Sequence, residues 1–368
     1  MILVTCLFSL SFSSGSKKIE GIYGAKGQKF RLEVVAENLE IPWGFDFLPK
    51  QKMIFTERKG SIKILDLKTG KITSLKGVPL VAASGQGGML DVIAHPDFSK
   101  NQTIFFSFSK KVTGGYTTVI SRAKVKGNKL ISMREIFVAR PANNKGLHFG
   151  SRLVIDKSGY LFFTVGDRGE RHKAQSLKTH NGKVLRIHQD GKIPSDNPFR
   201  KAEGALGEIW SYGHRNPQGL TIDPVTGDLW SQEHGPRGGD EINIIKRAAN
   251  FGWPVITYGK EYWGPSIGEG THKVGMRQPR HYWVPSIAPS GLTFYTGDKF
   301  KSWKGSLFSG ALRGAHLNRL VLVKGRVVKE ERLLEKLGQR IRNVKEGPEG
   351  YLYISIDDGK ILKLVPKG

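Results

Sequence analysis

A pattern of two short strands joined by a tight turn recurs six times along the chain. The first copy pairs the apolar stretch Trp43–Pro49 with Met53–Thr56 across a turn. Equivalent turn positions, 47 to 72 residues apart, are Pro49, Pro96, Lys157, Pro224, Thr296 and Pro348. Because a four-stranded propeller blade needs about 40 to 50 residues, this spacing allows one blade per copy with longer loops in the middle. The sequence therefore predicts an all-β fold, a six-bladed β-propeller of four-stranded antiparallel blades.

Further strands support this architecture. Ser61–Leu65, Lys183–Ile187 and Lys360–Leu364 continue three of the copies, and 46 scattered Gly residues are typical of many tight turns. The early stretch Phe30–Val35 is expected to close the ring beside the C-terminal strands. A helix is predicted only for Val328–Leu337. A pair of β-sandwiches is the alternative, but six matched copies along one chain favour the propeller.

The N-terminus resembles an export signal. An apolar stretch, Ile2–Phe12, is followed by small residues, so residues 1–16 are expected to be a signal peptide and residues 20–368 one propeller domain. Export would place the protein in the periplasm or outside the cell. Cys6 is the one cysteine, which excludes a disulfide framework and a cysteine-based zinc site. No apolar run reaches the roughly 18 residues that a membrane-spanning helix needs.

The chain is strongly basic, with 58 Lys and Arg against 32 Asp and Glu and a formal net charge of +26. Such a charge attracts anionic surfaces but does not determine the fold. Binding of nucleic acid or another polyanion is therefore one functional alternative. The basic residues are spread over all blades and no nucleic-acid-binding motif is present, so no nucleic-acid partner is expected.

Polar segments gather where the pattern expects turns, and in a propeller such turns converge on one mouth of the channel. His148 and Asp167 flank one predicted hairpin, and a histidine held by a carboxylate is an oriented general base. Arg340 and Arg342 share one face of a strand, and their planar guanidinium groups suit carboxylates or phosphates. A solvated strand edge and a His that caps a turn are the structural alternatives for these pairs.

The Gly-rich segment Gly235–Glu241 combines exposed backbone carbonyls with two carboxylates. Hard cations such as Ca²⁺ take oxygen ligands of both kinds, although the spacing is not that of an EF-hand. An ordinary surface turn is the alternative interpretation of this segment.

Several of these segments together resemble the soluble quinoprotein glucose/sorbosone dehydrogenase family, especially its aldose sugar dehydrogenases. The likeness runs from about Glu37 to Val365. The segments that carry it are Gly85–Leu90, His95–Phe98, His148–Arg152 with Gly166-Asp167, Gly213–Gly219, Gly235-Pro236 with Asp240–Asn243, Asn250–Pro254, and Arg340 with Arg342.

This resemblance implies a six-bladed propeller that carries pyrroloquinoline quinone (PQQ) and Ca²⁺. It implies catalytic roles for His148 as general base, Asp167 as its orienting carboxylate, and Arg215 beside the reacting quinone carbonyl. The implied cofactor-binding residues are Gln86, Asn216, His234, Ser286, Arg313, Arg340 and Arg342. The implied ligands of one Ca²⁺ are the carbonyls of Gly235 and Pro236. A second, structural calcium site is implied near Glu241 and Phe251.

The implied reaction is oxidation of an aldose at its anomeric carbon to the lactone, with hydride transfer to the quinone and electrons passed to an external acceptor. Some positions depart from the glucose enzymes: His234 stands where they have Gln, Arg313 follows Leu312 where they place Lys on the cofactor, and Val284 replaces a Trp. These departures fit the aldose branch better. The main alternative function is a catalytically silent propeller that binds a protein or polyanionic ligand. A calcium-dependent lactonase would need a tighter carboxylate cluster than the sequence offers.

Overall fold

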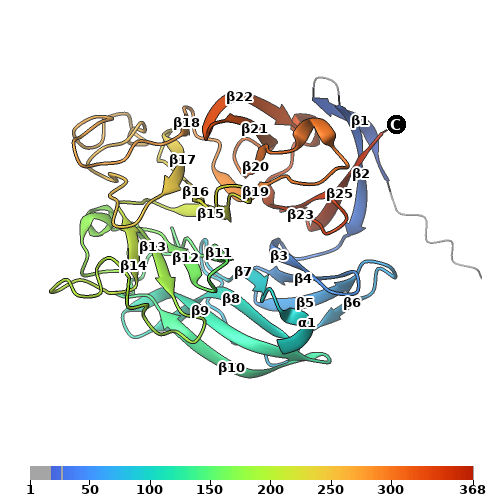
Figure 1. Ribbon diagram of the computed structural model, residues 1–368, viewed down its shortest axis with the longest axis horizontal. Coiled ribbons are helices and arrows are strands. Elements are labelled where there is room, and N and C mark those ends of the chain that lie inside the picture. The colour runs from blue at the N-terminus through green and yellow to red at the C-terminus, as the bar shows by residue number, and fades with distance from the viewer. Residues whose placement is uncertain (1–17, 26–27, 368) are drawn as a thin grey trace, which may run out of the picture.

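The strands form six sheets arranged in a ring, in a computed structural model that describes residues 18–25 and 28–367 (Figure 1). Five sheets have four antiparallel strands each, and the sixth has five strands. The predicted six-bladed propeller is therefore confirmed. The expected signal peptide at residues 1–16 lies outside the described residues and stays a prediction. No helix in the described part of the chain is long and apolar enough to cross a membrane.

The blades follow one another in chain order. The first consists of β3 (Pro42–Leu48), β4 (Lys52–Glu57), β5 (Ser61–Asp66) and β6 (Ile72–Ser74). The second consists of β7 (Met89–Ala94), β8 (Thr103–Val112), β9 (Gly115–Lys126) and β10 (Lys129–Val138). The third consists of β11 (Leu153–Ile155), β12 (Leu161–Val165), β13 (Lys183–Ile187) and β14 (Ile209–Tyr212).

The fourth blade consists of β15 (Pro217–Ile222), β16 (Leu229–Glu233), β17 (Asp240–Ile245) and β18 (His281–Trp283). The fifth consists of β19 (Pro289–Phe294), β20 (Leu307–Ala311), β21 (Leu317–Val323) and β22 (Arg326–Leu333). The sixth consists of β23 (Ile341–Glu346), β24 (Leu352–Ile356), β25 (Lys360–Pro366), β2 (Gln28–Ala36) and β1 (Lys18–Ala25). The first two strands of each blade coincide with one predicted copy of the repeat.

Strands from both ends of the chain close the ring in the sixth blade. β2 pairs antiparallel with β25, with Leu32 opposite Leu364, and β1 pairs with the outer edge of β2 (Figure 1). The predicted closing role of Phe30–Val35 is confirmed. This pairing ties residues more than 300 positions apart, so the ring cannot open without breaking a β-ladder.

The hydrophobic core is divided among the junctions between blades. Each of the six junctions is filled by one cluster of buried side chains, such as Ile54 and Ile62 of the first blade against Phe106 and Phe108 of the second. Two sheets that pack face to face each bury one apolar face. In a ring of blades every sheet has a neighbour on either side, so it buries both of its faces. The core therefore holds the inner strands at fixed positions around the channel.

The predicted helix at Val328–Leu337 is wrong. Residues up to Leu333 belong to β22, the outer strand of the fifth blade, and only Glu335–Leu337 form a short 3-10 turn. A ladder with β21 outweighs the local helix preference of this Glu- and Lys-rich segment, and it is reinforced by an ion pair of Arg319 with Glu331 at 2.6 Å. The other helical elements are α1 (Phe98–Asn101) and the 3-10 turns Arg171–Gln175 and Lys301–Trp303.

A buried arginine fills the middle of the ring. Arg152 donates to Asp91 Oδ1 at 3.1 Å, to the Gln218 carbonyl at 2.8 Å and to the Arg342 carbonyl at 3.2 Å. Its guanidinium also lies 4.2 Å from the ring centroid of Trp43. These partners come from the innermost strands of the first, second, fourth and sixth blades, so one side chain of the third blade links five blades across the channel.

Candidate functional site

The candidate site residues lie at one end of the channel because of their position in each blade. Gln86, His148 and Arg215 precede the innermost strands β7, β11 and β15, whereas Asp167 and His234 follow the second strands β12 and β16. Since the first two strands of a blade are antiparallel, the start of one and the end of the next share a face. The segments singled out in the sequence are thereby brought together.

A cavity of about 410 Å³ opens at this face. Its lining residues include Gln86, Asn216, His234, Arg340 and Arg342, which come from the second, fourth and sixth blades. The structure therefore gathers five of the seven expected cofactor-binding residues around one space.

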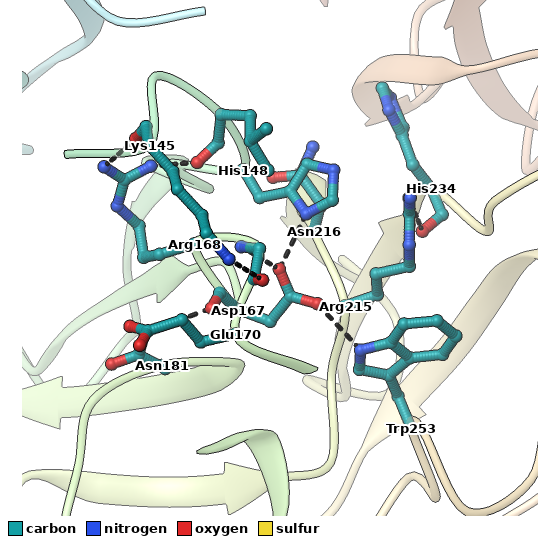
Figure 2. A network of polar contacts seen from close by, with 12 residues as sticks. Lys145, His148, Asp167, Arg168, Glu170, Asn181, Arg215, Asn216, His234 and Trp253 are labelled. Atoms are coloured by element: carbon teal, nitrogen blue, oxygen red, sulfur yellow. Dashed lines mark hydrogen bonds and ion pairs between the residues drawn. The ribbon is translucent and has the colours of Figure 1, made fainter. Parts of the chain in front are cut away.

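The centre of the polar network is the pair of His148 and Asp167 (Figure 2). His148 Nδ1 lies 2.6 Å from Asp167 Oδ1, and the other carboxylate oxygen accepts a hydrogen bond from Trp253 Nε1 at 2.8 Å. An ionised carboxylate can only accept, so Nδ1 carries the proton and the lone pair of the imidazole is on Nε2. Gln86 Oε1 accepts the backbone N–H of His148 at 2.8 Å and holds the loop from the neighbouring blade.

The protonation states of this pair follow from burial and charge. Burial lowers the pKa of His148, the hydrogen bond to Asp167 opposes this, and the charge of Arg215 lowers it again, so the net pKa is below its usual value. Burial alone would raise the pKa of Asp167, but the His148 hydrogen bond and the Arg215 charge bring it below its usual value. The pair is a neutral imidazole held by an ionised carboxylate, which is the arrangement of an oriented general base.

Arg215 contacts the backbone of the loop that carries His234, and the His234 side chain lines the large cavity. Arg215 Nη1 donates to the carbonyls of His234 at 3.1 Å and Gly235 at 2.8 Å, and the guanidinium lies 5.4 Å from the Trp253 ring centroid. His234 Nε2 lies 2.7 Å from the Pro289 carbonyl, so Nε2 carries the proton. Burial lowers the pKa of His234 to about 3, with the charge of Arg215 adding to the effect, and the imidazole is neutral.

Two arginines of the sixth blade share one carboxylate. Arg340 Nε donates to Asp357 at 2.9 Å, and Arg342 donates through Nε at 2.9 Å and Nη2 at 2.7 Å. Arg58 also lines the cavity and donates to the Gly85 carbonyl at 2.6 Å. Three guanidinium groups against one carboxylate leave an excess of positive charge on this wall, which suits a polycarboxylate ligand.

A second, much smaller cavity of about 10 Å³ adjoins Arg215. Its lining includes Glu233, Gly235, Glu241 and Phe251, so it contains two expected calcium-site residues and one expected calcium-binding carbonyl. Burial and the charge of Glu233 raise the pKa of Glu241 to about 8. Phe251 stacks on His214 at a centroid distance of 4.6 Å. In the described part of the chain no three His, Cys, Asp or Glu side chains form a metal-ligating group, so backbone carbonyls would have to complete the coordination.

Two expected cofactor residues do not line the cavity. Ser286 donates to both oxygens of Asp240, at 2.9 and 2.8 Å, and thereby braces the loop that carries Gly235, whose N–H donates to the same carboxylate at 2.8 Å. The Arg313 side chain is exposed. The preceding residue, Leu312, lines the cavity instead.

Four residues near the cavity have no predicted role in the sequence: Trp253, Asp357, Arg58 and Arg168. Trp253 lies in the segment Asn250–Pro254, which carries part of the family resemblance but implies no role for this residue. Arg58 and Asp357 directly follow β4 and β24, as Asp167 and His234 follow β12 and β16. The register of the repeat alone could have identified this pair as mouth residues.

Gly166 is required where two loops touch, and its substitution gives a testable prediction. A Cβ on Gly166 would lie 2.2 Å from the His148 carbonyl oxygen and 2.9 Å from Asn216 Oδ1. Gly166→Ala is therefore expected to displace His148 and to lower kcat about 100-fold, the cost of misplacing a reacting group by about 1 Å. Steady-state kinetics of the two proteins would measure the change in kcat.

The matched control is Gly207→Ala, where a Cβ meets the flexible Ile193 side chain at 3.3 Å and the Arg200 Cα at 3.4 Å, an ordinary van der Waals contact. That variant should keep its activity. Equal kcat values for the two variants would contradict the tight contact between the loops.

Comparison with known proteins identifies the family of this chain. Residues 39–363 match the family model described as Glucose / Sorbosone dehydrogenase. The chain is 42% identical over 344 residues to aldose sugar dehydrogenase YliI of Escherichia coli, covering 91% of this chain and 93% of that protein.

Two solved structures extend the comparison. The crystal structure of the soluble aldose sugar dehydrogenase of Escherichia coli in its apo form has a TM-score of 0.89 at 41% identity, covering 92% of this chain and all of that one. The PQQ-bound aldose sugar dehydrogenase of Streptomyces coelicolor has a TM-score of 0.74 at 28% identity, covering 92% of this chain and 99% of that one. With a family match over nearly the whole ring, the chain belongs to the glucose/sorbosone dehydrogenase family.

Proposed function

We propose that this protein oxidises aldose sugars at the anomeric carbon to the lactone, using PQQ and Ca²⁺. The observation that carries the proposal is the His148–Asp167 pair, in which His148 directly precedes Phe149 in the lining of a cavity with an excess of guanidinium groups. The similarity to named aldose sugar dehydrogenases supports the substrate class.

The residues of the large cavity fit PQQ. PQQ carries three carboxylates, and Arg58, Arg340 and Arg342 line the wall with only Asp357 to neutralise them. Asn216 and Gln86 add amide groups to the same lining. When bound, PQQ would supply the two-electron acceptor for the hydride of the sugar. A PQQ-bound relative of similar fold supports this assignment.

The smaller cavity fits a calcium ion. Glu233 and Glu241 face it together, and two neighbouring buried carboxylates repel unless a proton or a cation lies between them. Carboxylate and carbonyl oxygens are the ligands that Ca²⁺ takes. The Gly235 carbonyl accepts a hydrogen bond from Arg215 with one lone pair, and its other lone pair would be available to the ion. Pro236 would contribute a second carbonyl from the same loop.

The chain's own residues would perform the proton chemistry. His148 Nε2 would accept the proton of the anomeric hydroxyl, and the resulting imidazolium would be stabilised by Asp167. Trp253 and the Gly169 N–H, at 2.8 and 2.7 Å from the Asp167 carboxylate, keep that carboxylate ionised and in place. The positive charge of Arg215 would stabilise negative charge that develops on the quinone as it accepts the hydride.

The remaining parts of the proposal concern the setting of the reaction. Electrons would leave to an external acceptor, and the protein would act after export, as the apolar N-terminal segment indicates.

Reconstitution tests the proposal. The purified protein would be incubated with PQQ and CaCl₂ and assayed for dye reduction with glucose, xylose and maltose. We expect uptake of the quinone, visible in its absorption spectrum, and dye reduction that depends on sugar, PQQ and Ca²⁺. The lactone would be identified by mass spectrometry.

The apo protein without added quinone is the control and should reduce no dye. Absence of both quinone uptake and dye reduction with all three sugars would contradict the proposal and favour a propeller that only binds a ligand.

A further inference from the structure

Arg168 is a buried cation that the proposed reaction does not use. It directly follows Asp167 in the chain and its residue is only 2% exposed. Among the described residues it forms no ion pair with a carboxylate. Its guanidinium instead donates to three backbone carbonyls: those of Leu147, of Lys145 at 2.8 Å and of Tyr116 at 3.3 Å.

These carbonyls belong mainly to the loop that carries His148. Figure 2 shows the Arg168 side chain reaching from the Asp167 loop to Lys145, whereas the His148 imidazole lies on the opposite side of its loop, near Asn216. The guanidinium carbon also lies 3.5 Å from the ring centroid of Phe149, the residue that follows His148. Arg168 therefore contacts residues that precede His148 in the chain and the residue that follows it.

The His148 loop needs such support because its backbone is strained. His148 has a φ of 53°, a left-handed conformation that costs free energy for a residue with a Cβ. Other bonds between the two loops run in the opposite direction, from Asn143 Nδ2 to the Arg168 carbonyl at 3.0 Å and from Lys145 Nζ to the Gly169 carbonyl at 2.7 Å. The two loops are thus joined by hydrogen bonds donated in both directions, next to the His148–Asp167 hydrogen bond.

The charge of Arg168 also acts on the imidazole. The groups that face His148 are Asp167, which raises its pKa, and Arg215 and Arg168, which lower it together with burial; the neighbouring imidazole of His234 is neutral. Burial lowers the pKa of Arg168 to about 10, with Asp167 and Glu170 opposing the shift, so the guanidinium stays protonated and its charge disfavours an imidazolium at His148.

We propose that Arg168 is a positioning residue for His148, holding the loop Lys145–Phe149 by its carbonyls and placing a positive charge in the surroundings of the imidazole. This inference rests on the proposed role of His148 as the base. Arg168 itself does not touch the sugar.

The experiment compares Arg168→Met and Arg168→Lys with the unchanged protein. The titration of the His148 imidazole would be followed by NMR without sugar, with the signal assigned from its loss in His148→Gln. In Arg168→Met we expect the His148 pKa to rise, because a nearby positive charge is removed, and kcat to fall about 10- to 100-fold with KM little changed. The acid limb of kcat/KM should move to higher pH.

Arg168→Lys separates charge from geometry. It keeps the charge but loses the planar fork, so His148 should titrate as in the unchanged protein while kcat still falls. This variant decides the matter if Arg168→Met does not fold. Arg186→Met is the matched control, because Arg186 is buried in the same blade over Trp210 at 4.3 Å and bonds Asn197 at 2.6 Å, away from the site.

Unchanged His148 titration in Arg168→Met, or unchanged kcat in Arg168→Lys, would overturn the inference. The NMR result does not depend on turnover. A shifted His148 titration together with a fully active His148→Gln variant would leave the inferred contact standing and overturn the catalytic role of His148 instead.

Discussion

Replacing His148 by glutamine is expected to lower kcat for aldose oxidation by a factor of about 10² to 10⁴, the usual contribution of a positioned general base. Glutamine can still donate a hydrogen bond to Asp167, but its amide oxygen does not accept a proton near neutral pH. KM should change little, because the cavity wall of arginines and amides is untouched. Steady-state dye reduction by protein loaded with PQQ and Ca²⁺ would measure both constants.

The pH profile adds a second measurement to this prediction. Burial and the Arg215 charge hold the pKa of His148 below its usual value despite the Asp167 hydrogen bond. The base is therefore in its neutral form above that lowered pKa, and kcat/KM should fall only at a pH below the usual titration range of an imidazole. The residual activity of His148→Gln should lack this acid limb.

His188→Gln serves as the control, because His188 is exposed on the third blade and should be dispensable. Full activity of His148→Gln would remove the catalytic assignment while leaving the fold as it is.

The fold was predictable where the sequence repeats. Each apolar–turn–aromatic copy became the inner two strands of a blade, because those strands are buried on both faces and their residues are dictated by packing. The outer strand β22 was missed because it is largely exposed, and its charged residues are compatible with either a helix or a strand. Its pairing with β21 exists only in the tertiary structure.

The site was predictable to the level of the loop but not of the side chain. The position of a residue in the repeat shows which face its loop occupies, and this placed Arg340, Arg342 and Asn216 correctly around the cavity. It does not show which way a side chain turns. Ser286 therefore braces Asp240, and Arg313 points to solvent, although both lie in loops of the same face.

The interior of the channel escaped sequence analysis for a related reason. Arg152 looks like one more polar residue of the His148 segment, yet its partners come from four other blades. It also donates to the carbonyl of Arg342, whose side chain lines the cavity. The integrity of the ring and the shape of the site are thus coupled through one buried cation.

Removing the carboxylate partner of that cation is expected to destabilise the protein severely. In Asp91→Ala, Arg152 would remain buried with its charge unpaired, and the Leu153 N–H would lose the acceptor that lies 3.0 Å away. Breaking a buried ion pair from one side costs about 3 to 5 kcal/mol, far more than the loss of an exposed pair. The free energy of unfolding, measured by urea titration followed by tryptophan fluorescence, should fall by this amount.

A second substitution separates the charge from the lost contacts. Adding Arg152→Met to Asp91→Ala removes the unpaired guanidinium, so the double variant should be destabilised by clearly less than the sum of the two single variants. Asp298→Ala, which breaks the exposed pair of Asp298 with Lys304 at 2.8 Å, should leave the urea midpoint nearly unchanged. If Asp91→Ala unfolded at the same urea concentration as the unchanged protein, Arg152 would not hold the blades together through Asp91. The ring would then depend on its six apolar junctions and the β2–β25 closure alone.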